Sequence, residues 1–451
     1  MRRPLLLALL ALPAFAPAGA ATLERGPYLQ RIGPDGAVVR WRTAEATDTR
    51  LDWGAVAGAP DASYLEPTPT TEHRVELAGL AAETTYYYLA GSSTEWLAGG
   101  DADHAFRTAP APGASRPLRL WAIGDSGEAN AGQAAVRDAY LADAAGAPTD
   151  VWLLLGDNAY DTGTDAQYTA ALFTPYAAIL RSTAAWTVYG NHDSYSSDAA
   201  TLTGPYFESF SLPRLGQAGG VASGTEAYYS FDRGPLHVVV LDTAESTIGA
   251  GAPMLQWLEA DLAANRRPWT IAALHHPPYT KGSHDSDDPA DSGGIMGVVR
   301  ATLLPLLEAH GVDLVLSGHS HVYERSFLLD GHYGDSSTLD PLSMVLDGGD
   351  GDPAGDGPYV KAPGTHGGTV YVVAGSSARL GTGPLDHPAM AVGTASLASL
   401  VVEIDGDRLT ARALDDQGAE IDRFVPIEPG VPLFTDDYEL GSLARWNSVV
   451  D

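Results

Sequence analysis

The sequence predicts an all-β N-terminal domain followed by a larger α/β domain. Residues 22–108 contain short segments of alternating apolar and polar residues separated by Gly, Pro and Asp turns, which is the pattern of half-buried strands. From residue 118 onward, strand-like apolar runs alternate with helical stretches, as is typical of an α/β domain. Five short polar motifs each follow one of these apolar runs, so their side chains should gather at one edge of a sheet.

The first predicted domain spans residues 22–108 and is a β-sandwich. Leu80, followed by Tyr86 and Tyr88, resembles the aromatic corner of a fibronectin type III-like sandwich. Residues 108–113 are rich in Pro and end in Gly, and such residues interrupt regular structure. We therefore expect the linker between the two domains at this position.

The second predicted domain spans residues 116–426. Its predicted strands before the polar motifs cover residues 118–123, 151–155, 186–189, 269–274 and 312–316. Its predicted helices cover residues 130–142, 253–264 and 295–310. The last part returns to strands over residues 369–374, 396–404, 408–414 and 420–425. With 451 residues, the chain is long enough to bury two unequal cores.

The two ends of the chain carry separate predictions. Residues 1–20 combine a positive start, a short apolar middle and small residues at the end, which predicts a secretory signal peptide cleaved after Ala20. The mature protein would then be secreted or periplasmic, and no later stretch has the length and apolar character of a membrane span. Residues 427–451 are predicted to form a linker and a disordered or loosely docked tail. The chain has no cysteine, so its stability must come from the core and from bound metal.

The strongly acidic composition argues against nucleic acid and anionic membranes as partners. The formal charge is −31 at pH 7, and it becomes −33 when Arg2 and Arg3 leave with the signal peptide. Small phosphorylated substrates are also anionic, so cations gathered in a site would have to bind them. Apart from its effect on binding partners, a large net charge mainly favours solubility.

A Gly- and Asp-rich stretch at residues 347–356 interrupts the second domain. Its spacing does not match an EF-hand calcium loop, and it lacks the closing Glu of that motif. The sequence therefore predicts a surface insertion, with a cation-binding or substrate-side loop as the alternative.

The five polar motifs occur in a fixed order along the chain. They are Gly124-Asp125-Ser126-Gly127, Gly156-Asp157-Asn158-Ala159-Tyr160, Gly190-Asn191-His192-Asp193, Leu274-His275-His276-Pro277 and Gly318-His319-Ser320-His321. Each motif alone is more typical of a turn or a helix cap than of a site. Their conjunction, each after a strand, is the layout of a two-metal hydrolytic centre.

Seven side chains in these motifs are candidate metal ligands: Asp125, Asp157, Tyr160, Asn191, His275, His319 and His321. A hard, highly charged ion prefers carboxylate and phenolate oxygens, whereas divalent ions such as zinc, iron and manganese also accept imidazole and carbonyl oxygen. If two ions share one carboxylate, each ion has four protein ligands and retains room for water and substrate.

These motifs resemble those of the purple acid phosphatases, in the calcineurin-like metallophosphoesterase superfamily. On that pattern, a ferric ion would be held by Asp125, Asp157, Tyr160 and His321. Asp157 would bridge to a second, divalent ion of Fe, Zn or Mn, held by Asn191, His275 and His319. The resemblance implies a four-layer α/β/β/α sandwich for the second domain, and in many members a fibronectin-like domain precedes it. Tyr160 specifies the subgroup, because most of the superfamily lacks this tyrosine, whose phenolate gives the family its colour.

Two further histidines resemble family positions that contact phosphate and protonate the leaving group. His192 follows Asn191 directly, and His284 lies in the loop after His275, so both are candidate general acids. Asp193 departs from the family, which more often has Glu at this position. His276 is expected to pack or to support the ligands from outside.

The resemblance implies an acid phosphatase-like, metal-dependent phosphoric ester hydrolase. Phosphate monoesters would be hydrolysed by attack of a metal-bound hydroxide. A phosphodiesterase or nucleotide hydrolase with the same metal centre is the nearest alternative. A non-catalytic surface binding protein is disfavoured, because all seven candidate ligands are intact.

Overall fold

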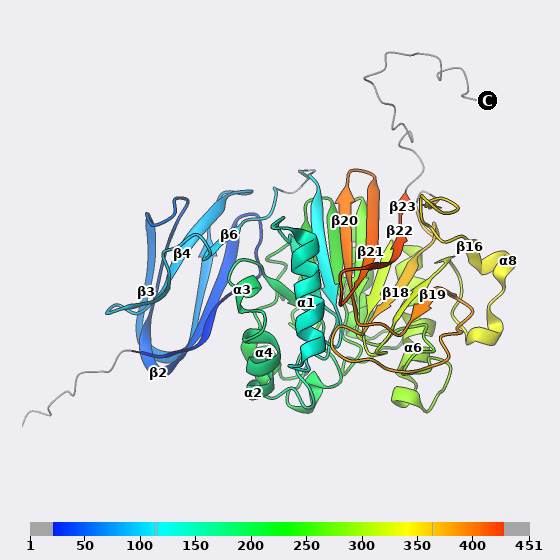
Figure 1. Ribbon diagram of the computed structural model, residues 1–451, viewed down its shortest axis with the longest axis horizontal. Helices are drawn as coiled ribbons and strands as arrows, with labels where there is room; N and C mark the ends of the chain where they lie inside the picture. The colour runs from blue at the N-terminus through cyan, green and yellow to red at the C-terminus, as the bar shows by residue number, and fades with distance from the viewer. Residues whose placement is uncertain (1–20, 112, 115, 363, 428–451) are drawn as a thin grey trace, which may run out of the picture.

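A computed structural model of the chain describes residues 21–427 except 112, 115 and 363. The predicted signal peptide and residues 428–451 of the predicted tail lie outside the described residues. Within the described part, no helix has the length and apolar character needed to cross a membrane. Figure 1 shows a smaller strand-rich lobe at one end of the molecule and a larger lobe of strands and helices beside it.

The smaller lobe is built from six strands. They are β1 (Leu23–Gln30), β2 (Gly36–Gly54), β3 (Ala62–Ala78), β4 (Thr85–Gly91), β5 (Trp96–Gly99) and β6 (Ala105–Arg107). The long β2 pairs with β1 over its first half, with β4 over its second half and with β3 along both, so all six strands share one hydrogen-bonded network. The Tyr86 hydroxyl accepts a hydrogen bond from the backbone N–H of Ala81 at 2.9 Å. The all-β prediction is confirmed, whereas the fibronectin type III-like assignment stays a prediction.

The larger lobe contains an eight-stranded sheet. Its strands are β7 (Leu118–Ile123), β8 (Val151–Leu154), β9 (Ala185–Thr187), β17 (Tyr359–Val360), β20 (Ala398–Asp405), β21 (Arg408–Asp415), β22 (Glu420–Phe424) and β23 (Pro426–Ile427). The strands β7, β8 and β9 are parallel neighbours. Helix α1 (Ala131–Ala144) covers this sheet, and its Tyr140 stacks on Trp121 of β7 with ring centroids 4.1 Å apart.

A second, seven-stranded sheet lies against the first. Its strands are β10 (Tyr229–Arg233), β11 (Leu236–Val240), β12 (Trp269–Ala273), β13 (Leu314–Ser317), β14 (Tyr323–Ser326), β18 (Val370–Ala374) and β19 (Met390–Thr394). The helices α5 (Pro253–Ala264), α6 (Ile295–Thr302) and α7 (Leu304–Ala309) pack on its outer face through buried residues such as Leu258, Val299 and Leu307. The predicted helical stretch over residues 295–310 is confirmed, but it is divided into the two helices α6 and α7. Pro305 lies in the first turn of α7, where its missing N–H is tolerated, and the chain starts a new helix there.

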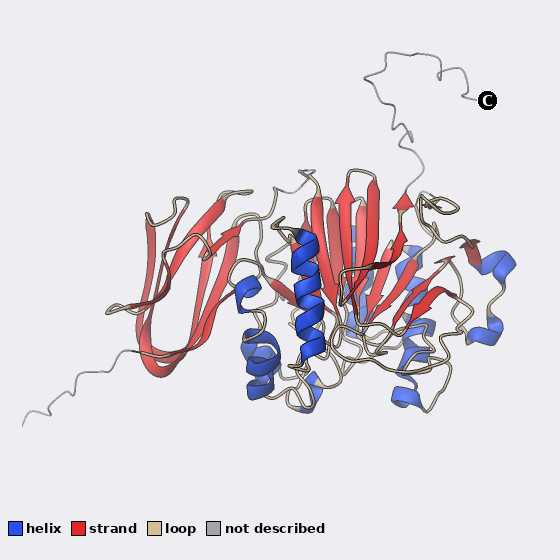
Figure 2. Cartoon of the chain, viewed as in Figure 1, coloured by secondary structure: helices blue, strands red, loops and turns tan. Residues whose placement is uncertain are grey.

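The layer order is therefore helix, sheet, sheet, helix, which confirms the predicted four-layer α/β/β/α arrangement (Figure 2). Short elements connect the layers: α2 (Asp165–Tyr168), η1 (Thr169–Phe173), α3 (Ala177–Leu180), η2 (Asp193–Tyr195), α4 (Pro205–Ser209), η3 (Asp291–Gly294), β15 (Leu328–Leu329), η4 (Ser336–Thr338), α8 (Pro341–Met344) and β16 (Val345–Asp347). The smaller lobe docks on two of them. Arg25 Nη2 donates to Asp165 Oδ1 at 2.9 Å, and the Tyr28 hydroxyl donates to the carbonyl of Ser209 at 3.0 Å.

Candidate metal centre

The candidate ligands follow the carboxyl ends of strands from both sheets. Asp125, Asp157 and Asn191 follow the parallel strands β7, β8 and β9. His275 follows β12, and His319 follows β13, in the other sheet. This is the sheet edge at which ligands of open α/β sheets bind, and here it draws on both sheets together.

Left-handed backbone and close-packed glycines bring the motifs together. Asp125, Asp157 and His319 have φ of 55°, 53° and 67°, a region that costs a non-glycine residue roughly 1–2 kcal/mol. A Cβ on Gly156 would lie 2.3 Å from His275 Nδ1, and one on Gly318 would lie 2.4 Å from Asp125 Oδ2. These two motif glycines therefore allow side chains from different strands to approach one another.

One group of side chains surrounds the hydroxyl of Tyr160. This hydroxyl lies 2.9 Å from Asp125 Oδ1, 2.9 Å from Asp157 Oδ2 and 3.2 Å from His321 Nε2. His321 Nε2 also lies 3.5 Å from Asp125 Oδ1. These are the four residues that the resemblance assigns to the ferric ion, and the structure brings them together.

A second group surrounds the side-chain oxygen of Asn191. Asn191 Oδ1 lies 2.9 Å from His275 Nε2 and 3.0 Å from His319 Nδ1. His275 Nε2 lies 3.4 Å from Asp157 Oδ1, so Asp157 touches both groups. This is the position that a bridging carboxylate requires. The other nitrogen of His275, Nδ1, donates to the carbonyl of Leu155 at 2.8 Å, which orients its ring.

The pKa values of the buried side chains in the cluster are shifted by burial and by their charged neighbours. Burial opposes ionisation of Asp157, but its neighbours His275 and His192 outweigh burial and hold its pKa well below the usual range. Burial lowers the pKa of His275, but Asp157 outweighs it and raises the pKa to about 9. Burial and the two carboxylates raise the pKa of Tyr160 well above 10. Positive charge must therefore be supplied to this cluster before the phenol can ionise.

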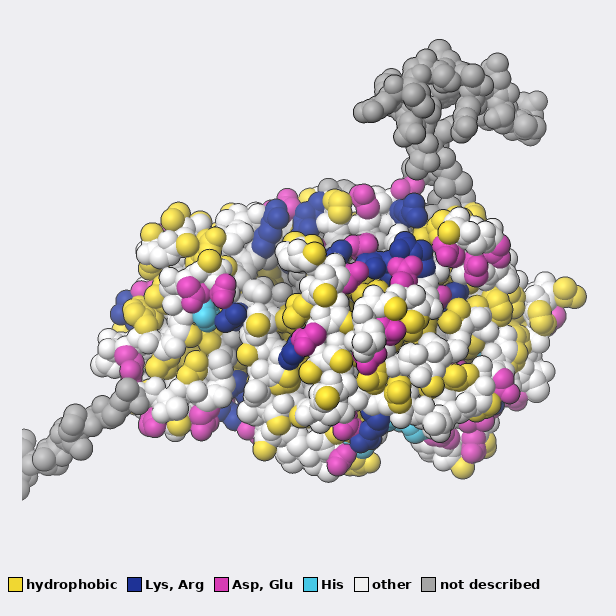
Figure 3. Space-filling model, in the orientation of Figure 1, with side chains coloured by type: hydrophobic (Ala, Val, Ile, Leu, Met, Phe, Trp, Pro, Cys, Tyr) yellow, Lys and Arg dark blue, Asp and Glu magenta, His cyan; other side chains and the backbone are white. Residues whose placement is uncertain are grey.

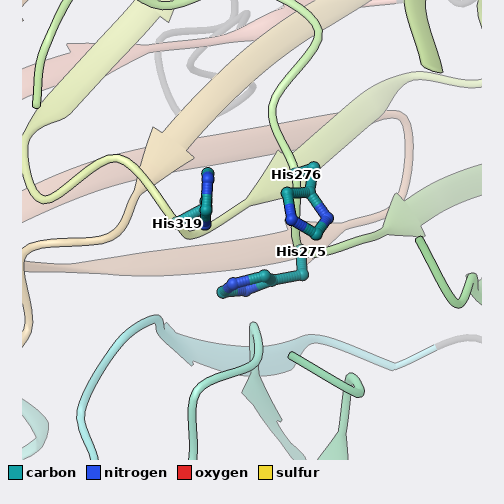
Figure 4. Close-up of side chains that lie close together, drawn as sticks. All are labelled: His275, His276 and His319. Atoms are coloured by element: carbon teal, nitrogen blue, oxygen red, sulfur yellow. The ribbon is translucent and has the colours of Figure 1, made fainter. Parts of the chain in front are cut away.

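His276 lies beside the second group, as Figure 4 shows for the imidazoles of His275, His276 and His319. The rings of His276 and His319 have centroids 4.4 Å apart. The hydroxyl of Thr243 lies 2.9 Å from His276 Nδ1, and burial together with His275 lowers the pKa of His276 well below 6.5. A neutral, hydrogen-bonded imidazole is consistent with the predicted supporting role.

The two candidate general acids contact different members of the cluster. His192 Nδ1 donates to the carbonyl of Asp161 at 2.6 Å, and its Nε2 lies 3.9 Å from Asp157 Oδ2. The ring of His284 stacks on that of His319 with centroids 4.0 Å apart. Their side chains are 27% and 29% exposed, so both can meet a substrate that enters from solvent.

Three groups at the site were missed by the sequence analysis. Asp291 Oδ1 lies 2.8 Å from His284 Nδ1, and the Ser292 hydroxyl lies 2.7 Å from His319 Nε2. The guanidinium of Arg379 lies 4.8 Å from the centre of the Tyr160 ring. None of the three belongs to a motif, so no local pattern could have identified them.

Asp193 is the fourth residue whose role the sequence did not reveal. Its carboxylate is fully buried and accepts hydrogen bonds from Gly190 N at 3.0 Å, Asn158 Nδ2 at 2.8 Å and the Tyr168 hydroxyl. Burial and the nearby charge of Asp157 raise its pKa to about 6. Asp193 thus links the second motif to the third. Both of its carboxylate oxygens accept hydrogen bonds within this link.

Comparison with known families agrees with this arrangement. The calcineurin-like phosphoesterase family matches residues 118–323, which contain every candidate ligand and both candidate acids. Residues 118–323 therefore resemble a calcineurin-like phosphoesterase domain. Within residues 118–323, two neighbouring clusters of described side chains could each hold an ion. One consists of Asp125, Asp157 and His275, and the other of His275, His276 and His319.

Purple acid phosphatases are homologues of the phosphoesterase domain, so the resemblance inferred from the motifs is confirmed. The chain is 30% identical to purple acid phosphatase 22 of Arabidopsis thaliana over 268 residues, which cover 56% of this chain and 53% of that protein. It is 25% identical to the probable purple acid phosphatase 20 of the same plant over 324 residues, which cover 66% and 68% of the two chains. The chain thus spans about half the length of the first of these relatives.

Solved structures share the fold. The purple acid phosphatase PPD1 from yellow lupin (Lupinus luteus) seeds has a TM-score of 0.65 at 18% identity, over 90% of this chain and 75% of that one. PhoD has a TM-score of 0.61 at 14% identity, over 88% and 87% of the two chains. These structures show that the fold is shared, whereas the activity, the metal content and the role of each ligand residue stay predictions.

Proposed function

We propose that the protein is an exported phosphatase that uses two metal ions to hydrolyse phosphate monoesters. One observation carries this proposal: the seven candidate ligands form two adjoining groups that share Asp157. Export is supported by the sequence of residues 1–20, and an acid phosphatase by the names of the relatives.

The donor set suits two different metal ions. Asp125, Asp157, Tyr160 and His321 would hold a ferric ion, because carboxylate and phenolate oxygens favour a hard cation. Asn191, His275 and His319, with Asp157 as the bridge, would hold a divalent ion of Fe, Zn or Mn. Asp125 is 0% exposed and Asp157 is 1% exposed. Buried carboxylates need positive charge nearby, which bound cations would supply. The bound pair would lower the pKa of water, supply the nucleophile near neutral pH and offset the charge of the phosphate.

The chain's own histidines would act on the departing group. His284 is held by Asp291 through Nδ1, which leaves Nε2 to donate a hydrogen bond or a proton to substrate oxygen. His192 is held in the same way by the carbonyl of Asp161. Both rings are therefore oriented before substrate arrives, and each would stabilise a phosphoryl oxygen or protonate the leaving alkoxide.

The substrates are proposed to be small phosphorylated molecules. The chain carries a formal net charge of −31 at pH 7, and Figure 3 shows Lys and Arg side chains gathered in a few groups on the visible face. An anionic substrate therefore depends on positive charge at the site itself. Arg379, with a side chain 40% exposed beside Tyr160, is such a charge, although Glu128 Oε1 lies 2.5 Å from its Nη2.

The deciding experiment measures metal content and substrate range on the same preparation. Elemental analysis is expected to return about two metal ions per chain, at least one of them iron, by the two-metal template. A panel of monoesters, diesters and nucleotides is expected to show the highest kcat/KM for monoesters. Preference for diesters or nucleotides would select the alternative activity, and full activity without bound transition metal would refute the proposal.

Matched variants separate ligands from other histidines. His319→Ala is expected to lose both metal and activity, because it removes a proposed ligand. His310→Ala is the control, because this histidine lies at the end of α7, outside the five motifs and outside the clusters of described side chains that could hold an ion. Equal metal loss in both variants would mean that the assay reports general destabilisation.

A further inference from the structure

A cavity between the two lobes has no part in the chemistry described so far. Its volume is about 530 Å³, which lies in the range of small-molecule sites, and such sites favour domain interfaces. Phe106 of β6 and Ile179 of α3 give it apolar walls, one from each lobe. Residues 146–150, just before β8, form another wall.

The charged residues in the wall are mostly cationic. Among the described lining residues, three are arginines, Arg107, Arg116 and Arg233, and one is a carboxylate, Asp150. The wall thus carries a formal charge of +2, or +1 when Glu83 is counted, in a chain whose charge is −31. Glu83 is not a wall residue, but its Oε1 lies 3.2 Å from Arg116 Nε and 3.6 Å from Arg107 Nη2. This reversal of sign is local, so the general acidity of the protein does not explain it.

Arg233 is the buried member of this group and lacks a full set of partners. It is 6% exposed, and its Nε has no hydrogen-bond acceptor among the residues that the structure describes. The carboxylate near it is that of Asp150, whose Oδ1 lies 3.7 Å from Arg233 Nη2. That carboxylate already pairs with Arg116 and accepts from the backbone N–H of Arg119 at 3.0 Å. Burying an incompletely paired guanidinium is unfavourable, and an anion in the cavity would relieve that cost.

The cavity lies at the opposite edge of the sheet from the candidate metal centre. Arg116 precedes β7 by two residues, whereas Asp125 follows the same strand by two. Likewise, Asp150 precedes β8 by one residue, and Asp157 follows it by three. A strand of six residues spans about 20 Å, so the cavity is separate from the metal centre.

We propose that this cavity binds a small organic anion. Its anionic group, a phosphate, sulfonate or carboxylate, lies against Arg116 and Arg233. A planar guanidinium group can donate hydrogen bonds to two oxygens of such a group at once. Its apolar part packs against Phe106 and Ile179. Because these residues belong to different lobes, the bound molecule also holds the lobes together.

The probe for this site is naphthalene-2-sulfonate, titrated by calorimetry into the full-length, metal-loaded protein. A sulfonate is a weak metal ligand, and the fused rings match the apolar walls. The uncharged naphthalene-2-sulfonamide has nearly the same shape and is expected to bind at least about tenfold more weakly, because it cannot form charge-assisted hydrogen bonds.

Variants locate the site. Arg233→Met and Arg116→Gln are each expected to weaken binding of the sulfonate at least about tenfold. Arg116 has a side chain 21% exposed, so its replacement tests the site even if the buried Arg233 is needed for folding. Arg408→Ala removes an exposed arginine elsewhere and is expected to leave the affinity unchanged. Asp157→Asn, which disables the metal centre, is also expected to leave it unchanged.

Three results would overturn the proposal. The first is absence of measurable binding of the sulfonate to the wild-type protein. The second is equal affinity for the charged and the uncharged probe. The third is loss of binding in Asp157→Asn together with retention in the Arg116→Gln variant, which would place the probe at the metal centre.

Discussion

A buried charge network outside the metal centre makes the stability of this protein depend on pH above neutrality. His237 of β11 is 1% exposed. Its Nδ1 lies 2.8 Å from Asp232 Oδ1, and its Nε2 lies 2.9 Å from Asp261 Oδ2 on α5. Both ring nitrogens face carboxylates, so the doubly protonated imidazolium is the form that satisfies both. The network joins the outer helix layer to the seven-stranded sheet.

The size of the effect follows from the pKa of His237. Burial alone would lower this pKa, but hydrogen bonds to Asp232 and Asp261 outweigh burial and raise it to about 9. The folded-state pKa is therefore above the unfolded value of about 6.5. The stabilisation is fully present below pH 6.5 and is lost as pH rises toward 9. At about 1.36 kcal/mol for each pKa unit, it amounts to on the order of 3 kcal/mol.

The test compares the wild-type protein with His237→Gln at the same metal loading. Urea unfolding at several pH values gives the free energy of unfolding of each protein. The difference between them is expected to shrink by about 3 kcal/mol between pH 6 and pH 9.5, because only the wild type carries the proton. His366→Gln is the control, since ion pairs of exposed side chains contribute little. A difference between wild type and His237→Gln that does not change with pH would refute the reasoning.

Further predictions concern the phosphoesterase site. Tyr160→Phe is expected to abolish a visible absorption band of the oxidised protein while circular dichroism stays unchanged; an unchanged visible spectrum would exclude the phenolate ligand. His284→Ala is expected to keep the metals and to lose roughly 10²–10⁴-fold in kcat, and wild-type rates with a poor leaving group would exclude its acid role. Asp291→Asn is expected to shift the pH profile of kcat with a smaller loss of rate, because it only orients His284; an unshifted profile would exclude that coupling. Shortening the insertion at residues 330–367 is expected to change relative kcat/KM among substrates more than metal content, and equal loss on all substrates with metal loss would show a structural role.

The fold could largely be predicted because its strands are strongly patterned. The predicted strand over residues 118–123 and the predicted helix over residues 253–264 have the bounds that the structure shows. Buried parallel strands are continuous apolar runs, and such runs are visible in a sequence. The short elements between β8 and β10, such as α3 and α4, have only four or five residues, which is too few to establish a helical period.

The candidate ligands could be predicted from their motifs, whereas their supporting residues could not. Asp125 and Asp157 follow apolar strands directly, so chain order alone places them at one edge of a sheet. Asp291 and Arg379 reach the site from loops, and their contacts depend on how those loops fold back. The same holds for Arg233, whose neighbour Asp150 lies more than eighty residues earlier in the chain. Local patterns carry no information on such contacts.

The absence of cysteine gives the metal centre a structural consequence as well as a catalytic one. Asp157 follows a strand of the eight-stranded sheet, and His275 follows a strand of the seven-stranded sheet. Their side chains approach to 3.4 Å, so ions bound there would join the two sheets where no disulfide can. Any ion that binds the folded chain and not the unfolded one stabilises the fold in proportion to the logarithm of its concentration over its dissociation constant. The buried carboxylates of Asp125 and Asp157 destabilise the fold when no metal is bound. Bound metal would stabilise the fold through these same two groups.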